Sequence, residues 1–141
     1  YLPAQENVVI DVVKKKKKNL LGDGELILVV DDEESIREIT KVTLEANGYS
    51  AITAVDGTEA ITAFATHGNK IALVITDMMM PFMSGTATIR AIQKMNPKAK
   101  FIAVSGLKQS GDIMAQDSVV FLHKPYTSEK LLATVAELMN R

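Results

Sequence analysis

The sequence predicts an α/β protein in which an open, five-stranded parallel sheet is doubly wound by helices on both faces. Four continuous apolar runs rich in β-branched residues, and a weaker fifth, recur along the chain. Strands that are apolar on both sides are typical of a parallel sheet covered by helices. Helical segments alternate with these runs in the order βαβαβαβαβα, for which short right-handed crossovers leave few arrangements. At 141 residues the chain has the length of one domain.

The expected strands are the five apolar runs. In order they are ELILVV (25–30), YSAITAV (49–55), IALVIT (71–76), KFIAVS (100–105) and SVVFLH (118–123), of which the second is the weakest. In an open parallel sheet, function gathers at the carboxyl ends of the strands, beside the point where the strand order reverses. The residues that follow each run are therefore the first candidates for a site.

The first helix is expected between the first two strands. Ser35 and Glu38 have the spacing of a capping box, and Asn47-Gly48 gives a stop signal. The residues that recur at helical spacing, and so form its predicted apolar face, are Ile36, Ile39 and Val42.

Three further helices are expected over residues 58–67, over residues 86–95 with a stop at Asn96-Pro97, and from Ser128 onward. Their predicted apolar positions are Ile61, Phe64, Ile89, Ile92, Leu131, Leu132, Val135, Leu138 and Met139. The segment between Gly106 and Asp117 contains a glycine and little periodicity, so the sequence leaves open whether it forms a helix.

The composition excludes several classes of site. The chain has no cysteine, which excludes disulfides and thiol chemistry, and two histidines make a histidine-based zinc site improbable. No apolar run reaches the roughly 20 residues of a membrane span. The phosphate-binding loops of P-loop and dinucleotide-binding proteins are also absent from the sequence.

Polar residues with compatible chemistry follow four of the five predicted strands. Asp31 and Asp32 follow the first, Asp77 the third, Ser105 ends the fourth and Lys124 follows the fifth. Clustered carboxylates repel one another, and a hard divalent cation such as Mg²⁺ or Mn²⁺ removes that repulsion. A fixed ammonium suits a phosphoryl group in transfer. Each residue alone is ordinary at a turn or a helix start, so the combination carries the prediction.

The motifs ILVVDDEESIR, LVITDMMMPFMSG, FIAVSG and FLHKPY resemble the four signatures of the receiver domain of two-component response regulators. The resemblance covers residues 25–141 and implies a flavodoxin-like (βα)5 fold. It implies that Asp77 accepts a phosphoryl group from a phosphohistidine. It also implies that Asp32, Asp77 and the Met79 backbone carbonyl bind Mg²⁺, with Mn²⁺ as a substitute, and that Asp31 acts through water.

The resemblance further implies that Ser105 and Lys124 contact the phosphoryl oxygens. Phe121 matches the aromatic switch position, whose rotation follows movement of the Ser105 hydroxyl, and the Lys124-Pro125 bond is expected to be cis. We also expect the apolar Met79 side chain to obstruct the attacking water and to give a long-lived phosphoryl state. The stretch from Ser105 to Lys124 is shorter than is usual in the family, so signalling through it is expected to differ.

Residues 1–24 are expected to be a tail and lysine-rich linker, with five lysines against three acids, whereas residues 25–141 carry 11 basic and 14 acidic groups. The run Lys14 to Lys18 reads best as a solvated linker, with binding to an anionic surface as the alternative. The acidic body has no electrostatic footprint for nucleic acid. The start, YLPA, resembles the end of a histidine kinase ATP-binding domain, which favours the C-terminal receiver of a hybrid sensor kinase over a stand-alone regulator.

The expected function is a cytoplasmic phosphoryl-accepting switch whose partner is a sensor histidine kinase or a histidine phosphotransfer domain. Such a domain catalyses its own phosphorylation and dephosphorylation, and weak homodimers are possible in the family. Two alternatives stay open. One is a non-phosphorylated interaction module of the same fold, and the other is a small Mg²⁺-dependent phosphatase, although the Asp-x-Asp pattern of that class is absent around Asp31 and Asp77.

Overall fold

A computed structural model describes residues 22–80, 83–106 and 118–140. Helices and strands alternate along the chain, as the apolar runs predict. Their bounds are β1 Leu26–Val30, α2 Glu34–Ala46, β2 Ser50–Ala54, α3 Gly57–His67, β3 Ile71–Asp77, α4 Gly85–Met95, β4 Phe101–Ser105, β5 Val119–His123 and α5 Ser128–Met139, with a 3-10 turn at Gly68–Lys70. Most of the predicted linker (residues 1–21) and the undecided segment between Gly106 and Asp117 lie outside the described residues.

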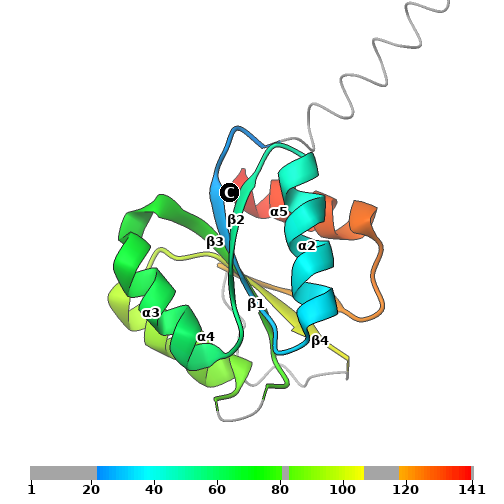
Figure 1. Ribbon diagram of the computed structural model, residues 1–141. Helices are drawn as coiled ribbons and strands as arrows, with labels where there is room; N and C mark the ends of the chain where they lie inside the picture. Colours follow the sequence, from blue (N-terminus) through cyan, green and yellow to red (C-terminus); the bar gives the residue numbers. More distant parts are fainter. Residues whose placement is uncertain (1–21, 81–82, 107–117, 141) are drawn as a thin grey trace, which may run out of the picture.

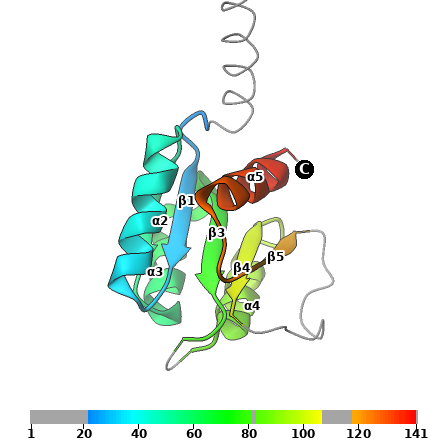
Figure 2. The same ribbon diagram turned by 90° about the vertical axis from the view of Figure 1, so that its right-hand side faces the viewer.

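The five strands form one parallel sheet in the order β2-β1-β3-β4-β5. Helices α2 and α5 cover one face and α3 and α4 the other, which gives three layers (Figures 1 and 2). This arrangement confirms the predicted doubly wound fold. The strand order reverses between β1 and β3, so the carboxyl ends of these two central strands open at the switch point.

Each face of the sheet has its own apolar core. On one face, Phe64 of α3 and Ile89 and Ile92 of α4 pack against residues of β1, β3 and β4. On the other, Leu44 of α2 and Val135 of α5 pack against the alternate residues of the same strands. Because the central strands are buried on both sides, their ends are held rigidly, and this fixes the residues that follow them.

The predicted capping box at Ser35 is wrong. The N-cap lies two residues earlier, at Glu33, which makes no side-chain hydrogen bond, and helix α2 begins at Glu34. The Asp31 carboxylate instead accepts a hydrogen bond from the Glu33 N–H at 2.9 Å, so the chain turns directly from the strand end into the helix.

The predicted apolar face of α2 is wrong at two of its three positions, since only Ile36 is partly buried. Ile39 and Val42 are 64% and 61% exposed, whereas Thr40 and Leu44 are buried. Thr40 and Leu44, spaced i and i+4, lie on the helix face that is buried in place of the expected one. Thr40 can be buried although it is polar. Its hydroxyl donates a hydrogen bond to the Ile36 carbonyl at 2.7 Å, so burying the side chain leaves no unpaired hydrogen-bond donor.

The remaining helices begin within one residue of their predicted starts, although their capping residues were not predicted. Asp56, Ser84 and Thr127 cap α3, α4 and α5, and each side chain accepts a hydrogen bond from a backbone N–H three residues on. Helix α2 ends at Asn47-Gly48, where Gly48 has a φ of 90°. Within the described residues, no helix is both long enough and apolar enough to cross a membrane.

Candidate functional site

Three carboxylates meet at the switch point of the sheet. Asp31 and Asp32 follow β1, Asp77 ends β3, and one oxygen of each lies within 4.8 Å of the others. Asp31 and Asp77 are 4% and 6% exposed, whereas Asp32 faces solvent. The structure therefore brings together the three aspartates that the sequence predicted would share this edge.

Backbone hydrogen bonds fix two of the carboxylates. Asp77 Oδ1 accepts from the Met79 N–H at 3.0 Å, and Asp31 Oδ1 accepts from the Glu33 N–H at 2.9 Å. In both cases the carboxylate accepts a hydrogen bond from the backbone N–H of the residue two places later, as in an Asx turn. Each of these hydrogen bonds restrains the orientation of its carboxylate.

Lys124 brings a positive charge to the same place. Its Nζ lies 3.6 Å from Asp77 Oδ2 and 3.9 Å from Asp31 Oδ2. The Lys124 N–H donates to the Ser105 carbonyl at 2.9 Å, which ties the residue to the end of β4, and the Lys124-Pro125 bond is cis, as expected. One ammonium therefore faces two buried carboxylates.

The pKa values reflect this crowding. Burial raises the pKa of the Asp31 carboxyl above its ordinary value, and the nearby charges of Asp77 and Asp32 raise it further, against the Glu33 N–H and Lys124. The pKa of Lys124 is raised, because attraction to Asp77 and Asp31 outweighs the opposing effect of burial. The site thus holds more negative charge than its own lysine neutralises, which fits a divalent cation bound by hard oxygen ligands.

The other predicted site residues lie on β4, on β5 and in the loop after β3. Ser105 ends β4, next to β3, and is fully buried. Phe121 lies on β5 opposite Ala103 and is partly buried, packed against the core. Met79 is 60% exposed at the rim. The positions of Ser105 and Phe121 are compatible with their predicted roles, which stay predictions.

Two residues near the site were not anticipated from the sequence. Arg37 of α2 donates from Nη1 to the Asp31 carbonyl at 2.8 Å and so ties the helix to the acidic loop. Tyr126 lies two residues after Lys124 and has a raised pKa, mainly through burial, which its hydrogen bond with Thr40 opposes. Both stand at the ends of quoted motifs, Arg37 in ILVVDDEESIR and Tyr126 in FLHKPY, but neither was given a role, because each contacts a residue on another element.

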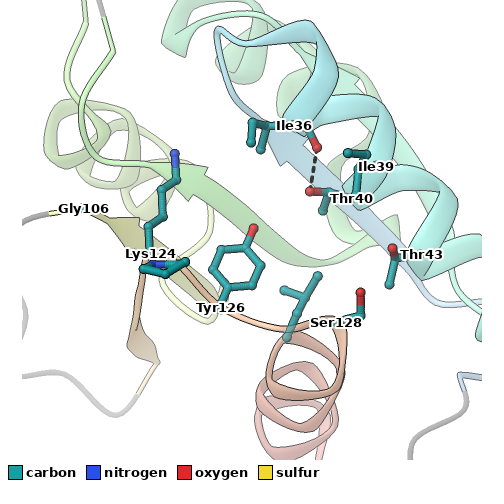
Figure 3. Close-up of a pocket in the computed structure, with 10 residues that line it drawn as sticks. Ile36, Ile39, Thr40, Thr43, Gly106, Lys124, Tyr126 and Ser128 are labelled. Carbon is teal, nitrogen blue, oxygen red and sulfur yellow. Dashed lines mark hydrogen bonds between the residues drawn. The ribbon is translucent and has the colours of Figure 1, made fainter.

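Tyr126 forms part of a groove of about 550 Å³ between α2 and the β5–α5 connection (Figure 3). The ring projects toward Thr40, and Lys124 extends from the same connection away from that ring. The other lining residues are Ile36, Ile39, Thr43, Gly106, Pro125, Ser128 and Leu131. Lys124 therefore borders both this largely apolar groove and the acidic cluster.

The geometry brings a buried, restrained carboxylate together with further acids and an ammonium, and a family model for the response regulator receiver domain matches residues 27–136. The chain belongs to the response regulator receiver domain family. Receiver domains are the phosphoryl-accepting switches of two-component signalling, so the family, fold and function class expected from the sequence are confirmed.

Relatives of this receiver domain include stand-alone and multidomain proteins. It is 30% identical over 131 residues to the sensor kinase CckA of Brucella abortus, which covers 91% of this chain but 14% of that one. It is 33% identical to PilG of Pseudomonas aeruginosa, with 81% and 87% covered. It spans 48% of a protein of Cyanophora paradoxa named "Probable transcriptional regulator ycf27", so two of these three relatives extend well beyond the matched part.

Solved structures agree with the fold of this receiver domain. A response regulator receiver domain protein of Clostridium thermocellum matches with a TM-score of 0.74 and 34% identity, over 82% of this chain and 94% of that one. The response regulator TrrA of Thermotoga maritima, solved in complex with Mg²⁺-BeF, matches with a TM-score of 0.72 and 34% identity, over 81% and 98%.

Proposed function

We propose that this receiver domain accepts a phosphoryl group on Asp77 from the phosphohistidine of a sensor kinase or phosphotransfer domain. One observation carries the proposal. The Asp77 carboxylate is held at a buried strand end by the Met79 N–H and faces the Lys124 ammonium at 3.6 Å, within reach of two further acids. A carboxylate so restrained can act as a nucleophile without first being ordered.

In the proposed transfer, an Asp77 carboxylate oxygen attacks phosphorus while the phosphorus–nitrogen bond to the partner's imidazole breaks. The product is an acyl phosphate on Asp77, and the imidazole leaves with its electron pair. Lys124 attracts the phosphoryl oxygens, and the Ser105 hydroxyl donates to one of them. Movement of Ser105 then lets Phe121 turn inward, which passes the signal to the surface of β5.

The acidic cluster fits Mg²⁺, and the Thermotoga relative with Mg²⁺-BeF supports that choice. We assign Asp32, Asp77 and the Met79 backbone carbonyl as its ligands, with Asp31 acting through water. When bound, the ion supplies positive charge that offsets the carboxylates and the incoming phosphoryl group. Mn²⁺ suits the same oxygen ligands and is proposed as a substitute.

The kinase partner is proposed to approach over α2. Its phosphohistidine must reach Asp77, so its surface must cover the elements next to the acidic cluster. On α2, Ile39 and Val42 are exposed, and the groove beside them shares Lys124 with the site. Apolar side chains on the partner would bury these two residues and align the donor phosphorus.

A single assay tests the proposed function. The chain is incubated with Mg²⁺ and acetyl phosphate, and intact-mass measurement follows the adduct, with Asp77→Asn as the control. A stable single adduct that is lost in the control supports the switch. Continuous phosphate release over many turnovers would show a phosphatase instead, and the absence of any adduct would show a non-phosphorylated interaction module.

Several finer expectations remain part of the proposal. A cytoplasmic location and weak homodimers rest on the family resemblance, the absence of nucleic-acid binding rests on the net acidic charge of residues 25–141, and a hybrid kinase as the parent chain rests on the YLPA start. The match to the sensor kinase CckA supports the last of these, and the match to PilG supports the stand-alone alternative.

A further inference from the structure

The methionines around Asp77 differ sharply in exposure. Met78 is 5% exposed, and its sulfur lies in the close contact between the loop and Gly85. Met83 places its sulfur against Gly57 of α3, and Met80 packs against the core. Met79, by contrast, is 60% exposed. Among the described methionines, only Met79 combines high exposure with a place beside the proposed nucleophile.

Met79 is coupled to Asp77 through the backbone. Its N–H donates to Asp77 Oδ1 at 3.0 Å, so its side chain leaves the chain next to the carboxylate that would carry the phosphoryl group. Asp77 itself is 6% exposed. A chemical change on the exposed Met79 side chain would therefore affect the water molecules next to Asp77 and would not disturb the packing of the core.

We propose that Met79 is an oxidation site through which peroxide shortens the lifetime of the phosphorylated state. This inference rests on the proposed function of Asp77. Hydrogen peroxide oxidises the thioether by two electrons: a sulfur–oxygen bond forms, the oxygen–oxygen bond breaks, and the second peroxide oxygen leaves as water. The product, methionine sulfoxide, is polar, and methionine sulfoxide reductases reverse the reaction.

The direction of the effect follows from hydrogen bonding. A thioether sulfur is a weak acceptor, whereas the sulfoxide oxygen is a strong one. At the mouth of the site it can accept a hydrogen bond from a water molecule that approaches the acyl phosphate, and so orient that water for attack. One ordinary hydrogen bond gained in the transition state is worth about 1 kcal/mol, which corresponds to about fivefold faster hydrolysis.

The chain offers a matched control. Met95, at the end of α4, is 43% exposed but lies at the opposite end of its helix from the Asp77 loop. Its sulfur should react with peroxide, yet its oxidation should not change the decay of the adduct. Met78 provides the complementary control, because its burial should protect it although it is the immediate neighbour of Asp77.

The experiment uses the whole chain with limiting hydrogen peroxide. Peptide mass mapping first records the order in which the methionines are oxidised, and Met79 should precede Met78 and Met83. Untreated and oxidised samples are then phosphorylated with acetyl phosphate and Mg²⁺, the donor is removed, and adduct decay is followed. Oxidation should speed decay about fivefold, and methionine sulfoxide reductase should restore the original rate.

Variants then assign the effect to one side chain. Met79→Leu should remove the response to peroxide, Met95→Leu should keep it, and Met79→Gln should decay rapidly without peroxide because an amide is a polar acceptor. Oxidation of Met78 before Met79, unchanged decay of fully oxidised chain, or a full peroxide response in Met79→Leu would each overturn the proposal. No adduct in untreated chain would instead reject the proposed function of Asp77, so the two failures are distinguishable.

Discussion

Neutralising Asp31 should stabilise the metal-free protein. Asp31 is 4% exposed, and its oxygen lies within 4.8 Å of an Asp77 oxygen. At an effective dielectric constant of about 20, that repulsion costs about 3.5 kcal/mol. Attraction between the Asp31 carboxylate and Lys124 Nζ at 3.9 Å stabilises the folded state by about 4 kcal/mol at the same dielectric constant. The repulsion and the attraction nearly cancel, so burial of the Asp31 charge destabilises the folded, metal-free protein.

Asp31→Asn removes that cost and keeps an oxygen that can accept the Glu33 N–H. We expect a gain of about 1 kcal/mol in the free energy of unfolding and a rise of about 4 °C in Tm without Mg²⁺. With Mg²⁺ the order should reverse, because ligand at 100 times its Kd adds about 2.7 kcal/mol to the wild type and much less to a variant with a weakened site.

The pH dependence has a definite sign. The pKa of Asp31 is raised in the folded state, so the folded chain holds a proton that the unfolded chain has already lost. Stability of the metal-free wild type should therefore fall as pH rises from the ordinary pKa of the carboxyl through the raised one, and this component should vanish in Asp31→Asn.

Thermal unfolding followed by circular dichroism, with and without Mg²⁺, measures these effects. Glu38→Gln is the control, because Glu38 is an exposed acid in the middle of α2 and is not part of the cluster. It removes the same charge and should shift neither Tm nor the response to Mg²⁺ by more than about 1 °C. A metal-free Asp31→Asn less stable than the wild type, or a wild type whose Tm ignores Mg²⁺, would refute the reasoning.

Three further predictions concern the lysine, the docking face and the core. Lys124→Ala should still form the adduct with acetyl phosphate but pass the signal poorly, and normal downstream transfer would contradict its role. Ile39→Asp should slow transfer from the cognate kinase about tenfold more than transfer from acetyl phosphate, because it places a charge in the proposed interface; equal slowing would exclude docking over α2. Phe101→Ala, at a fully buried position, should lower the free energy of unfolding by about 3–5 kcal/mol in urea titration.

Local signals were sufficient where one physical requirement dominated. A strand buried on both faces must be apolar throughout, so β1, β3 and β4 could be located from composition alone. The α3 and α4 helices were located for a similar reason, since the predicted apolar positions Phe64, Ile89 and Ile92 are all buried in the core. These requirements act within a few residues and do not depend on the rest of the fold.

Helix α2 shows where such signals fail. Periodicity favoured a row through Ile39 and Val42, but the helix is rotated so that Thr40 and Leu44 face the sheet. The rotation depends on how the chain leaves Asp31 and on the surfaces that β1 and β2 present. A hydroxyl that bonds its own helix costs little to bury, so polarity at Thr40 could not reveal the rotation.

The sequence by itself determined the order of the elements and the chemistry at the strand ends, because burial pattern and residue type are properties of short segments. It therefore also determined which acidic residues and which lysine lie at the same edge of the sheet. Only the tertiary structure decided the distances among Asp31, Asp77 and Lys124, the rotation of α2 and the exposure of Met79. Those features arise where segments that are remote in the chain pack together. How deeply each side chain is buried, and which charges surround it, depends on residues from other segments.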